Sequence, residues 1–285
     1  MSDVDEFVAE RPRLVGIAYR MLGSVADAED VVSEAYLRWQ DRGEREVTSS
    51  PSYLTTIVVR LCIDELRSAR VRRESYVGPW LPEPLVVTDD PPAAAAELAD
   101  SLSQAFLVVL EELAPVERAA FLLHEVFGYG YGELSGILDR GEPACRQLVS
   151  RARRRVGERR HRFDADRKAG EALAEQFLAA CATGDLDGLM SLMSEDAVLW
   201  TDGGGVVKAA RRPIHGPRKI ARFLVAVASE FAAETETRAA TINGRPGFLF
   251  FEAGAATATL SFDIVDGRVV GIASVLNPAK LQGLP

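Results

Sequence analysis

The first 160 residues carry apolar positions three or four residues apart, which is the spacing of α-helices that bury one face. In residues 26–40 the apolar stripe is Ala28, Val31, Val32, Ala35 and Trp39. In residues 143–160 it is Cys145, Leu148, Val149, Ala152 and Val156. We therefore expect helices through residues 7–73 and again through residues 97–160.

Helix-terminal residues divide these stretches into separate helices. Pro12 suits the first turn of one helix, and Ser24 can cap the next. Ser50 can cap a third helix that has Pro51 at its first position. In the second stretch we expect breaks at Pro115, residues 128–130 and residues 140–143.

The pattern changes twice along the chain. Residues 77–96 contain five prolines and no periodicity, so we interpret them as a linker. From about residue 168, helices are expected near 168–182, 185–193 and 217–230. Strands are expected near 196–201, 235–242, 247–252, 255–264 and 268–276, with a hairpin turn at Asp266-Gly267. The fold class is therefore multidomain, with two all-α units followed by an α+β unit.

Charge is unevenly distributed in this 285-residue chain. The formal net charge is −9, which argues against general nucleic-acid binding. Residues 144–162 nevertheless hold eight arginines and a single acid, Glu158. A basic helix in an acidic chain suits a protein that touches DNA at limited places and another protein elsewhere.

Cysteine usage and the N-terminus bear on the compartment. Cys62, Cys145 and Cys181 are far apart and form no ligand cluster, so we expect buried, reduced thiols and no metal. The acidic start is not a signal peptide, and no apolar run is long enough to cross a bilayer. We expect a cytoplasmic protein with no membrane contact.

Two of the expected helices have outer faces that resemble binding surfaces. The outer face of residues 26–40 carries Asp27, Asp30 and Glu34 around Leu37. This arrangement fits a dock for a basic partner, but taken alone it is better explained as a solvated acidic face with one exposed leucine. In residues 51–70 a narrow polar face combines an aromatic ring with hydroxyl and cationic groups. It could stack on bases and hold phosphates, or be an ordinary amphipathic face; its members are Tyr53, Thr56, Arg60 and Arg67.

The third helix, residues 143–160, favours DNA binding more directly. A shorter helix at 131–139 and a tight turn precede it, which is the layout of a helix-turn-helix. Gln and Arg can contact base edges, and the further arginines can contact phosphates. The candidate DNA-binding residues are Arg146, Gln147, Ser150, Arg151 and Arg154.

Together these segments resemble extracytoplasmic-function (ECF) sigma factors, the promoter-specificity subunits of bacterial RNA polymerase. The residues that carry the resemblance are 13–39 with the DAEDVV segment, 50–70, and 113–156. It implies a region 2 domain over 1–75, a linker over 76–97 and a region 4 domain over 98–163, with core polymerase and promoter DNA as partners.

The resemblance also implies residue roles. The acidic helix would dock on the clamp of the largest polymerase subunit through Asp27, Asp30, Val31, Glu34 and Leu37. Residues of about 43–53 and the helix after them would hold the melted −10 element. The helix-turn-helix would read the −35 element as duplex.

The C-terminal part, 168–285, resembles SnoaL-like α+β cone domains, and a subgroup of ECF sigma factors carries such a fusion. WLPEP stands intact at 80–84; the subgroup's DGGGK motif here lacks its adjacent lysine, and its NPDKL-like motif has alanine for the acid. The resemblance assigns an interdomain, regulatory role to Trp80, Leu81, Pro82, Asp202, Gly203, Gly204, Gly205, Asn277, Pro278 and Lys280.

Three functions remain open for the C-terminal part. We favour a built-in regulator that packs the linker near residues 202–205 and so sets the separation of the two promoter-reading domains. An enzyme with a DNA-binding appendage would use Asp202 and His215 as acid and base. A one-component regulator would sense a small ligand in the cone and bind promoter DNA without polymerase. We expect no cofactor.

Overall fold

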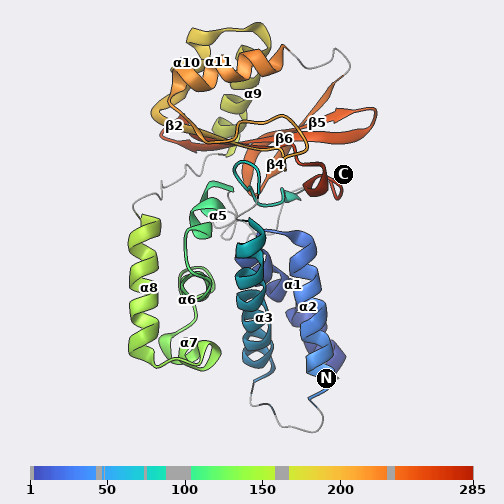
Figure 1. Ribbon diagram of the computed structural model, residues 1–285, viewed down its shortest axis with the longest axis vertical. Helices are drawn as coiled ribbons and strands as arrows, with labels where there is room; N and C mark the ends of the chain where they lie inside the picture. Colours follow the sequence, from blue (N-terminus) through green and yellow to red (C-terminus); the bar gives the residue numbers. More distant parts are fainter. Residues whose placement is uncertain are drawn as a thin grey trace. The chain divides into compact units, whose positions relative to one another are not determined.

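The computed structural model describes residues 3–42, 47, 49–73, 76–87, 104–157, 167–229 and 235–284 (Figure 1). The chain divides into two compact units. A helical unit contains residues 1–75 and 109–160, and a C-terminal unit contains residues 76–108 and 161–285. The expected linker therefore belongs with the C-terminal domain, and its residues 88–97 lie outside the described chain.

The helical unit begins with three packed helices, α1 (Asp3–Leu22), α2 (Val25–Gln40) and α3 (Ser50–Arg73). Pro12 lies inside α1, so the expectation that it opens a helix is wrong. Proline lacks the N–H that would bond the carbonyl of Val8. Both Pro12 and Val8 are exposed, so water can replace this bond and the helix continues.

Two expected caps have different outcomes. Ser24 caps α2 as expected, because its hydroxyl accepts a hydrogen bond from the N–H of Asp27 at 3.2 Å. For α3 the expected cap is one residue off. The hydroxyl of Ser49 accepts from the N–H of Ser52 at 3.5 Å, whereas Ser50 donates to Glu6 at 2.5 Å. Adjacent serines offer the same chemistry, and packing against α1 decides between them.

The second half of the helical unit contains α6 (Pro115–Glu125), α7 (Tyr131–Leu138) and α8 (Glu142–Gly157). The helix α5 (Gln104–Glu111) precedes them. All three expected breaks are confirmed. Asp139 ends α7 in the left-handed region at φ 53°, which the short Asp side chain tolerates.

The C-terminal unit is a mixed sheet with helices on one face (Figure 1). Its helices are α9 (Arg167–Thr183), α10 (Leu186–Leu192) and α11 (Pro217–Ala228). Its long strands are β2 (Met193–Asp202), β4 (Glu236–Ile242), β5 (Arg245–Glu252), β6 (Ala255–Val265) and β7 (Arg268–Val275). The five strands and three helices expected from the sequence are thus confirmed.

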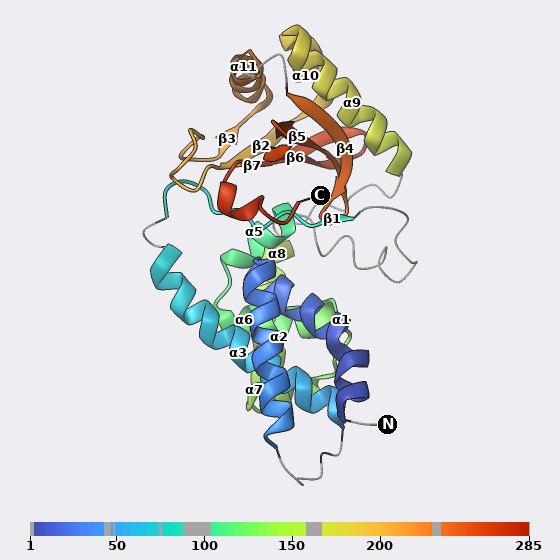
Figure 2. The ribbon, with the colours of Figure 1, turned by 90° about the vertical axis from the view of Figure 1, so that its right-hand side faces the viewer.

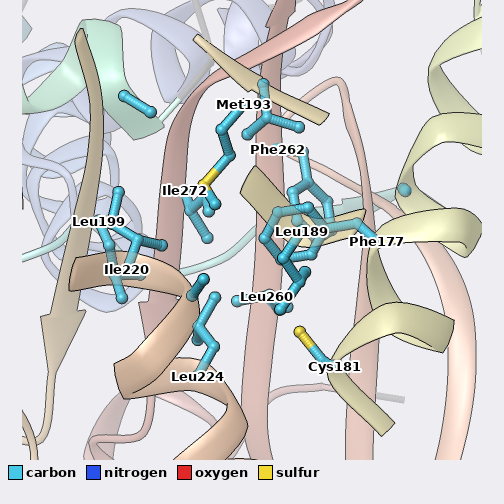
Figure 3. Packing of buried hydrophobic residues seen from close by; sticks show 14 of the residues in the cluster. Phe177, Cys181, Leu189, Met193, Leu199, Ile220, Leu224, Leu260, Phe262 and Ile272 are labelled. Carbon is cyan, nitrogen blue, oxygen red and sulfur yellow. The ribbon is translucent and has the colours of Figure 1, made fainter. Parts of the chain in front are cut away.

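The core of this unit lies between the helices and the sheet (Figure 3). Phe177 of α9 packs against Phe262 of β6 with ring centroids 5.0 Å apart. Leu189, Ile220 and Ile272 close the same core and have no exposed surface. A fully buried Leu or Phe stabilises the folded state by about 1.5–3 kcal/mol, so this layer holds the sheet to its helices.

The hairpins of the sheet depend on residues with positive φ. Asp266 and Gly267 lie at φ 49° and 67° and join β6 to β7, which confirms the expected turn. Asn243 and Gly244 lie at φ 51° and 73° and join β4 to β5. This Asn-Gly pair is an equally strong turn pattern that the sequence analysis missed.

Two short strands were not expected. The order of the sheet is β1-β4-β5-β6-β7-β2-β3, so β1 (Val86–Val87) and β3 (Ile214–His215) form opposite edges (Figure 2). β1 comes from the segment interpreted as an unstructured linker, and it pairs antiparallel with β4. Two-residue strands carry too little pattern to be recognised, because only their pairing defines them.

Candidate functional site

The acidic face of α2 is largely accessible. Asp30 is exposed, Asp27 and Glu34 are half-buried, and Leu37 is 54% exposed, which is unusual for a large apolar side chain. Glu34 pairs with Arg38 at 2.9 Å. Val31 is buried and fills the core beneath this face. The face therefore presents carboxylates around one apolar side chain, which suits a basic partner.

The polar face of α3 is only partly free. Arg60 and Arg67 are exposed, and Arg67 pairs with Asp64 at 3.1 Å. Tyr53 is half-buried against Trp39, with ring centroids 5.9 Å apart. The hydroxyl of Thr56 donates to the carbonyl of Ser52 at 2.8 Å. The two arginines thus reach solvent, whereas Tyr53 and Thr56 also serve the fold.

Helices α7 and α8 form the expected helix-turn-helix. Cys145, Val149, Ala152 and Val156 are buried, which leaves the other side of α8 to solvent. All five candidate DNA-binding residues of α8 are exposed. Arg159, Arg160 and Arg162 lie outside the described residues.

Most arginines of α8 form ion pairs with glutamates, whereas Arg154 forms none among the described residues. Arg155 pairs with Glu117 of α6 at 2.7 Å, and Arg153 pairs with Glu125 at 2.6 Å. Arg151 lies 3.6 Å from Glu117, and Arg146 pairs with Glu142 at 3.0 Å. Among the described residues, Arg154 makes no ion pair or hydrogen bond. Composition alone could not show that several of these cations hold α8 to α6.

Inside the helical unit, the two halves are joined by polar contacts. Arg13 donates to Thr55 of α3 at 2.9 Å, and both contact the hydroxyl of Tyr129, which follows α6. Arg118 of α6 donates to the carbonyl of Met21 at 2.6 Å and to Glu111 at 2.7 Å. Burial lowers the pKa of the Arg118 guanidinium to about 9. Thr55 and Tyr129 were not recognised from the sequence, because neither stands out by spacing.

In the C-terminal unit, the buried carboxylate of Asp202 gathers donors from distant parts of the chain. One oxygen accepts from the hydroxyl of Tyr76 at 2.6 Å and from the N–H of Gly204 at 3.0 Å. The other accepts from the N–H of Leu81 and from the ammonium of Lys280, both at 2.8 Å. Asp202 has no exposed surface, so these four bonds compensate for its lost hydration.

Asn277 and Lys280 complete this arrangement. The amide of Asn277 donates to the hydroxyl of Tyr76 at 2.9 Å. The ammonium of Lys280 also donates to the carbonyl of Leu81, and it lies 4.1 Å from the ring centroid of Trp80. We call this arrangement the latch; it consists of Tyr76, Trp80, Leu81, Asp202, Asn277 and Lys280.

Apolar contacts and a strand extend the latch. Leu81 is fully buried in an apolar cluster with Val275 and Leu281. The N–H of Leu85 donates to the side chain of Asn243 at 3.0 Å, just before the β1 pairing. Residues 76–87 are therefore held on the C-terminal domain from end to end. Tyr76 was missed in the sequence because it is a single polar residue without a motif, and the Asn-Gly turn pattern does not indicate that the side chain of Asn243 binds Leu85.

The glycines at 203–205 are needed because the chain approaches itself closely. A Cβ on Gly204, at φ 62°, would lie 2.5 Å from the side chain of Asn277. A Cβ on Gly203 would lie 2.2 Å from the carbonyl oxygen of Val207. Larger residues would separate Asp202 from Asn277, so steric contacts explain why glycine is needed at positions 203 and 204.

A cavity of about 400 Å³ lies between the helices and the sheet of the C-terminal unit. Its lining is mainly apolar, with Leu178, Phe223, Phe250 and Leu260 among the contributors. The hydroxyl of Thr235 lines it and has no hydrogen-bond partner among the described residues. Neither Asp202 nor His215 lines this cavity, and His215 is exposed, so the structure does not bring them together there.

Other chemical sites are scarce in the described part of the chain. The three cysteines are buried and form no disulfide, and burial raises the pKa of the Cys181 thiol to about 12. No group of three His, Cys, Asp or Glu side chains suits a metal ion among the described residues. No described helix is long and apolar enough to cross a membrane.

Comparison with family models divides the chain as its structure does. Sigma-70 region 2 matches residues 7–72, Sigma-70 region 4 matches residues 103–156, and the SnoaL-like domain matches residues 174–272. The region 2 match falls in the helical unit and the SnoaL-like match in the C-terminal unit, whereas the region 4 match falls in the helical unit except for its first residues, 103–108.

Similarity to curated proteins extends over nearly the whole chain. The chain is 38% identical to the ECF RNA polymerase sigma factor SigJ of Mycobacterium tuberculosis, over 99% of this chain and 94% of SigJ. It is 31% identical to the probable ECF sigma factor SigI of the same organism, over 97% and 93%. The crystal structure of SigJ matches with a TM-score of 0.79 at 35% identity, covering 99% of each chain.

The structural match therefore takes in the three helices of the first part, the helix-turn-helix and the α+β domain together. The chain belongs to the ECF RNA polymerase sigma factors that carry a C-terminal SnoaL-like domain.

Proposed function

We propose that this protein is an alternative sigma factor, which binds core RNA polymerase and directs initiation at specific promoters, with its C-terminal domain as a built-in regulator. The observation that carries the proposal is the full-length similarity to SigJ, joined to exposed partner faces on α2 and α8. Such work takes place in the cytoplasm, without a membrane and without a cofactor.

Each exposed face has a proposed partner. The carboxylates of α2, with Leu37, dock on the clamp of the largest polymerase subunit. Arg60 and Arg67, with Tyr53 and Thr56, hold the −10 element as a single strand. On α8, Gln147 and Arg154 are the strongest candidates for −35 contacts, since neither has an intramolecular partner among the described residues.

The latch suggests how regulation works. Residues 76–87 connect region 2 to region 4, and here they are bound to the C-terminal domain. A flexible connection of this length would let the two domains explore many separations, whereas a bound one restricts them. Opening or closing the latch therefore changes how well both domains reach their promoter elements together.

Run-off transcription with purified core polymerase tests this function. We would compare the full chain with Asp202→Asn and with chains ending near residues 168 and 277. We expect promoter-directed transcripts from the full chain, and changed transcript yield from the same start sites in the variants. Absence of any promoter-directed transcript would refute the sigma-factor function, and unchanged yield would refute the regulatory role.

Two other functions predict different results. A one-component regulator binds promoter duplex tightly without core polymerase, which a gel shift with and without core detects. An enzyme would lose turnover in Asp202→Ala. The geometry disfavours this enzyme, because both oxygens of Asp202 are occupied by donors and face the latch rather than the cavity.

The cavity favours one addition to the regulatory role, namely a small, mainly apolar ligand. Its volume suits such a ligand, and the unpartnered hydroxyl of Thr235 offers one hydrogen bond. Leu276 lines it and directly precedes Asn277 of the latch. The dye 1-anilinonaphthalene-8-sulfonate has apolar aromatic rings and one sulfonate, and its binding should be lost in Ala258→Phe, which fills the cavity; unchanged dye binding would count against the site.

A further inference from the structure

A stretch of the C-terminal domain is basic in an otherwise acidic surrounding. Residues 203–229 contain six lysines and arginines and no aspartate or glutamate. The rest of residues 161–285 contains seven basic and fifteen acidic residues. Basic residues are therefore concentrated in this stretch, and all acidic residues of the domain lie outside it.

The structure brings five of these cations to one edge of the domain. The segment between β2 and β3 carries Arg211 and Arg212, and α11, which packs on β2 and β3, carries Arg218, Lys219 and Arg222. All five side chains are exposed, and we call them the basic surface. β3 is the sheet edge opposite the strand β1 of the linker (Figure 2). At its other end the surface borders the linker, because the Cα of Arg211 lies next to Gly78. None of the five cations is a member of the latch.

The cations of the basic surface are unpaired, unlike others in the same domain. None of the five makes an ion pair or side-chain hydrogen bond with the residues that the structure describes. By contrast, Arg238 pairs with Glu236, Arg245 with Asp263 and Lys280 with Asp202.

The amphipathic character of α11 fixes the direction of these charges. Ile220, Ala221 and Leu224 are buried against the core. Arg218 and Arg222 lie one turn apart on the outer side, where like charges repel each other. An acid at a neighbouring position would relieve this repulsion, and none is present.

We propose that the basic surface binds the phosphate backbone of duplex DNA without sequence preference, so that the C-terminal domain is a further DNA contact of this sigma factor. Four of the five residues are arginines, whose planar guanidinium matches phosphate oxygens. The surface also offers more unpaired cations than the described part of α8, where most arginines pair with glutamates. That the phosphates are those of promoter DNA rests on the proposed function.

The test is the salt dependence of DNA binding by the full chain. Fluorescence anisotropy with a labelled random-sequence DNA duplex gives Kd over a range of NaCl concentrations. The variant R211Q/R218Q/R222Q is compared with K168Q/R238Q/R268Q, which removes the same charge from exposed positions elsewhere in the domain. A third variant, R211K/R218K/R222K, keeps the charge.

Each lost phosphate contact lowers the slope of log K against log salt by about 0.9. We expect R211Q/R218Q/R222Q to bind at least about tenfold more weakly at low salt and to lose about 2–3 from that slope. The matched control and the lysine variant should stay close to the unmodified chain. Thermal melting of all variants checks that α11 remains folded.

Equal slopes for the glutamine variant and its control would overturn the proposal. If the glutamine variant instead lost association with core polymerase at unchanged DNA slope, the surface would belong to an acidic protein partner and the proposal would be wrong. Run-off transcription separates this failure from that of the proposed function, because promoter-directed transcripts from the unmodified chain would leave the sigma-factor function standing.

Discussion

The helical unit and the C-terminal unit use charged residues in opposite ways. On α2 and α8 the charged side chains reach solvent, and even those that form ion pairs, such as Glu34 with Arg38 and Arg153 with Glu125, keep part of their surface exposed. In the latch, Asp202 is buried and Lys280 is partly buried, and they bond to Tyr76 and Leu81, which lie more than a hundred positions away in the chain. Exposed charges can be altered at little cost to the fold, whereas one change in a buried network disturbs every member. Recognition and regulation should therefore respond differently to mutation.

The largest effect is expected from Asp202→Asn. The substitution leaves Lys280 buried without its carboxylate, and breaking such a pair costs about 3–5 kcal/mol. We expect the amides of Leu81 and Leu85 to exchange hydrogen much faster, because residues 76–87 detach. Hydrogen exchange with mass spectrometry measures this. Glu195→Gln, an exposed change on the same strand, is the control, and equal protection in both variants would contradict the latch.

The second-largest effect is expected from the difference between the paired arginines of α8 and the unpaired Arg154. Arg154→Gln should weaken promoter binding by about 1–3 kcal/mol without changing thermal stability. Arg155→Gln should instead destabilise the helical unit by about 1 kcal/mol, since Glu117 loses its 2.7 Å partner. Promoter affinity of the polymerase complex and thermal melting distinguish the two. If both variants lost the same promoter affinity and the same thermal stability, Arg154 and Arg155 would have the same role and the prediction would be wrong.

A smaller effect is expected on the acidic face of α2. The double variant Asp30→Lys/Glu34→Lys should weaken association with core polymerase by about 1 kcal/mol or more. The loss should come mainly from a slower association rate, and it should shrink at high salt because salt screens the charges. Surface plasmon resonance at two salt concentrations measures it. Glu175→Lys with Asp187→Lys reverses the same charge on the C-terminal domain. An equal loss in both double variants would show that only net charge matters.

The smallest effect concerns Cys181. Burial raises its thiol pKa to about 12 from an ordinary value of 9.0, so the folded state binds this proton more tightly than the unfolded state does. The contribution of this thiol to the free energy of unfolding is therefore fully present below pH 9. It is lost as the pH rises towards 12, and the loss is less than about 1 kcal/mol at pH 9.5. Chemical denaturation of Cys181→Ala between pH 8 and 9.5 should show a shallower decline than the unmodified protein. A decline of the same steepness would contradict this.

The sequence by itself determined the helices, the long strands and the exposed faces, because each depends on local periodicity. The stripe of Ala28, Val32 and Trp39 fixes which side of α2 is buried, and so which side can meet a partner. The turn at Asp266-Gly267 is equally local, since it needs only residues that tolerate positive φ. Pro12 shows the limit, because its tolerance inside α1 depends on which face of the helix is exposed.

Only the tertiary structure decided which residues form the latch, and which arginines of α8 pair with α6 rather than face solvent alone. Asp202 and Gly204 meet Tyr76 and Asn277 through the fold of the whole C-terminal unit, and a motif of residue types cannot specify their hydrogen bonds. Likewise Arg154 and Arg155 are neighbours of the same type, yet only Arg155 reaches Glu117. A buried polar side chain is defined by its partners, and those partners are chosen by packing between segments far apart in the chain.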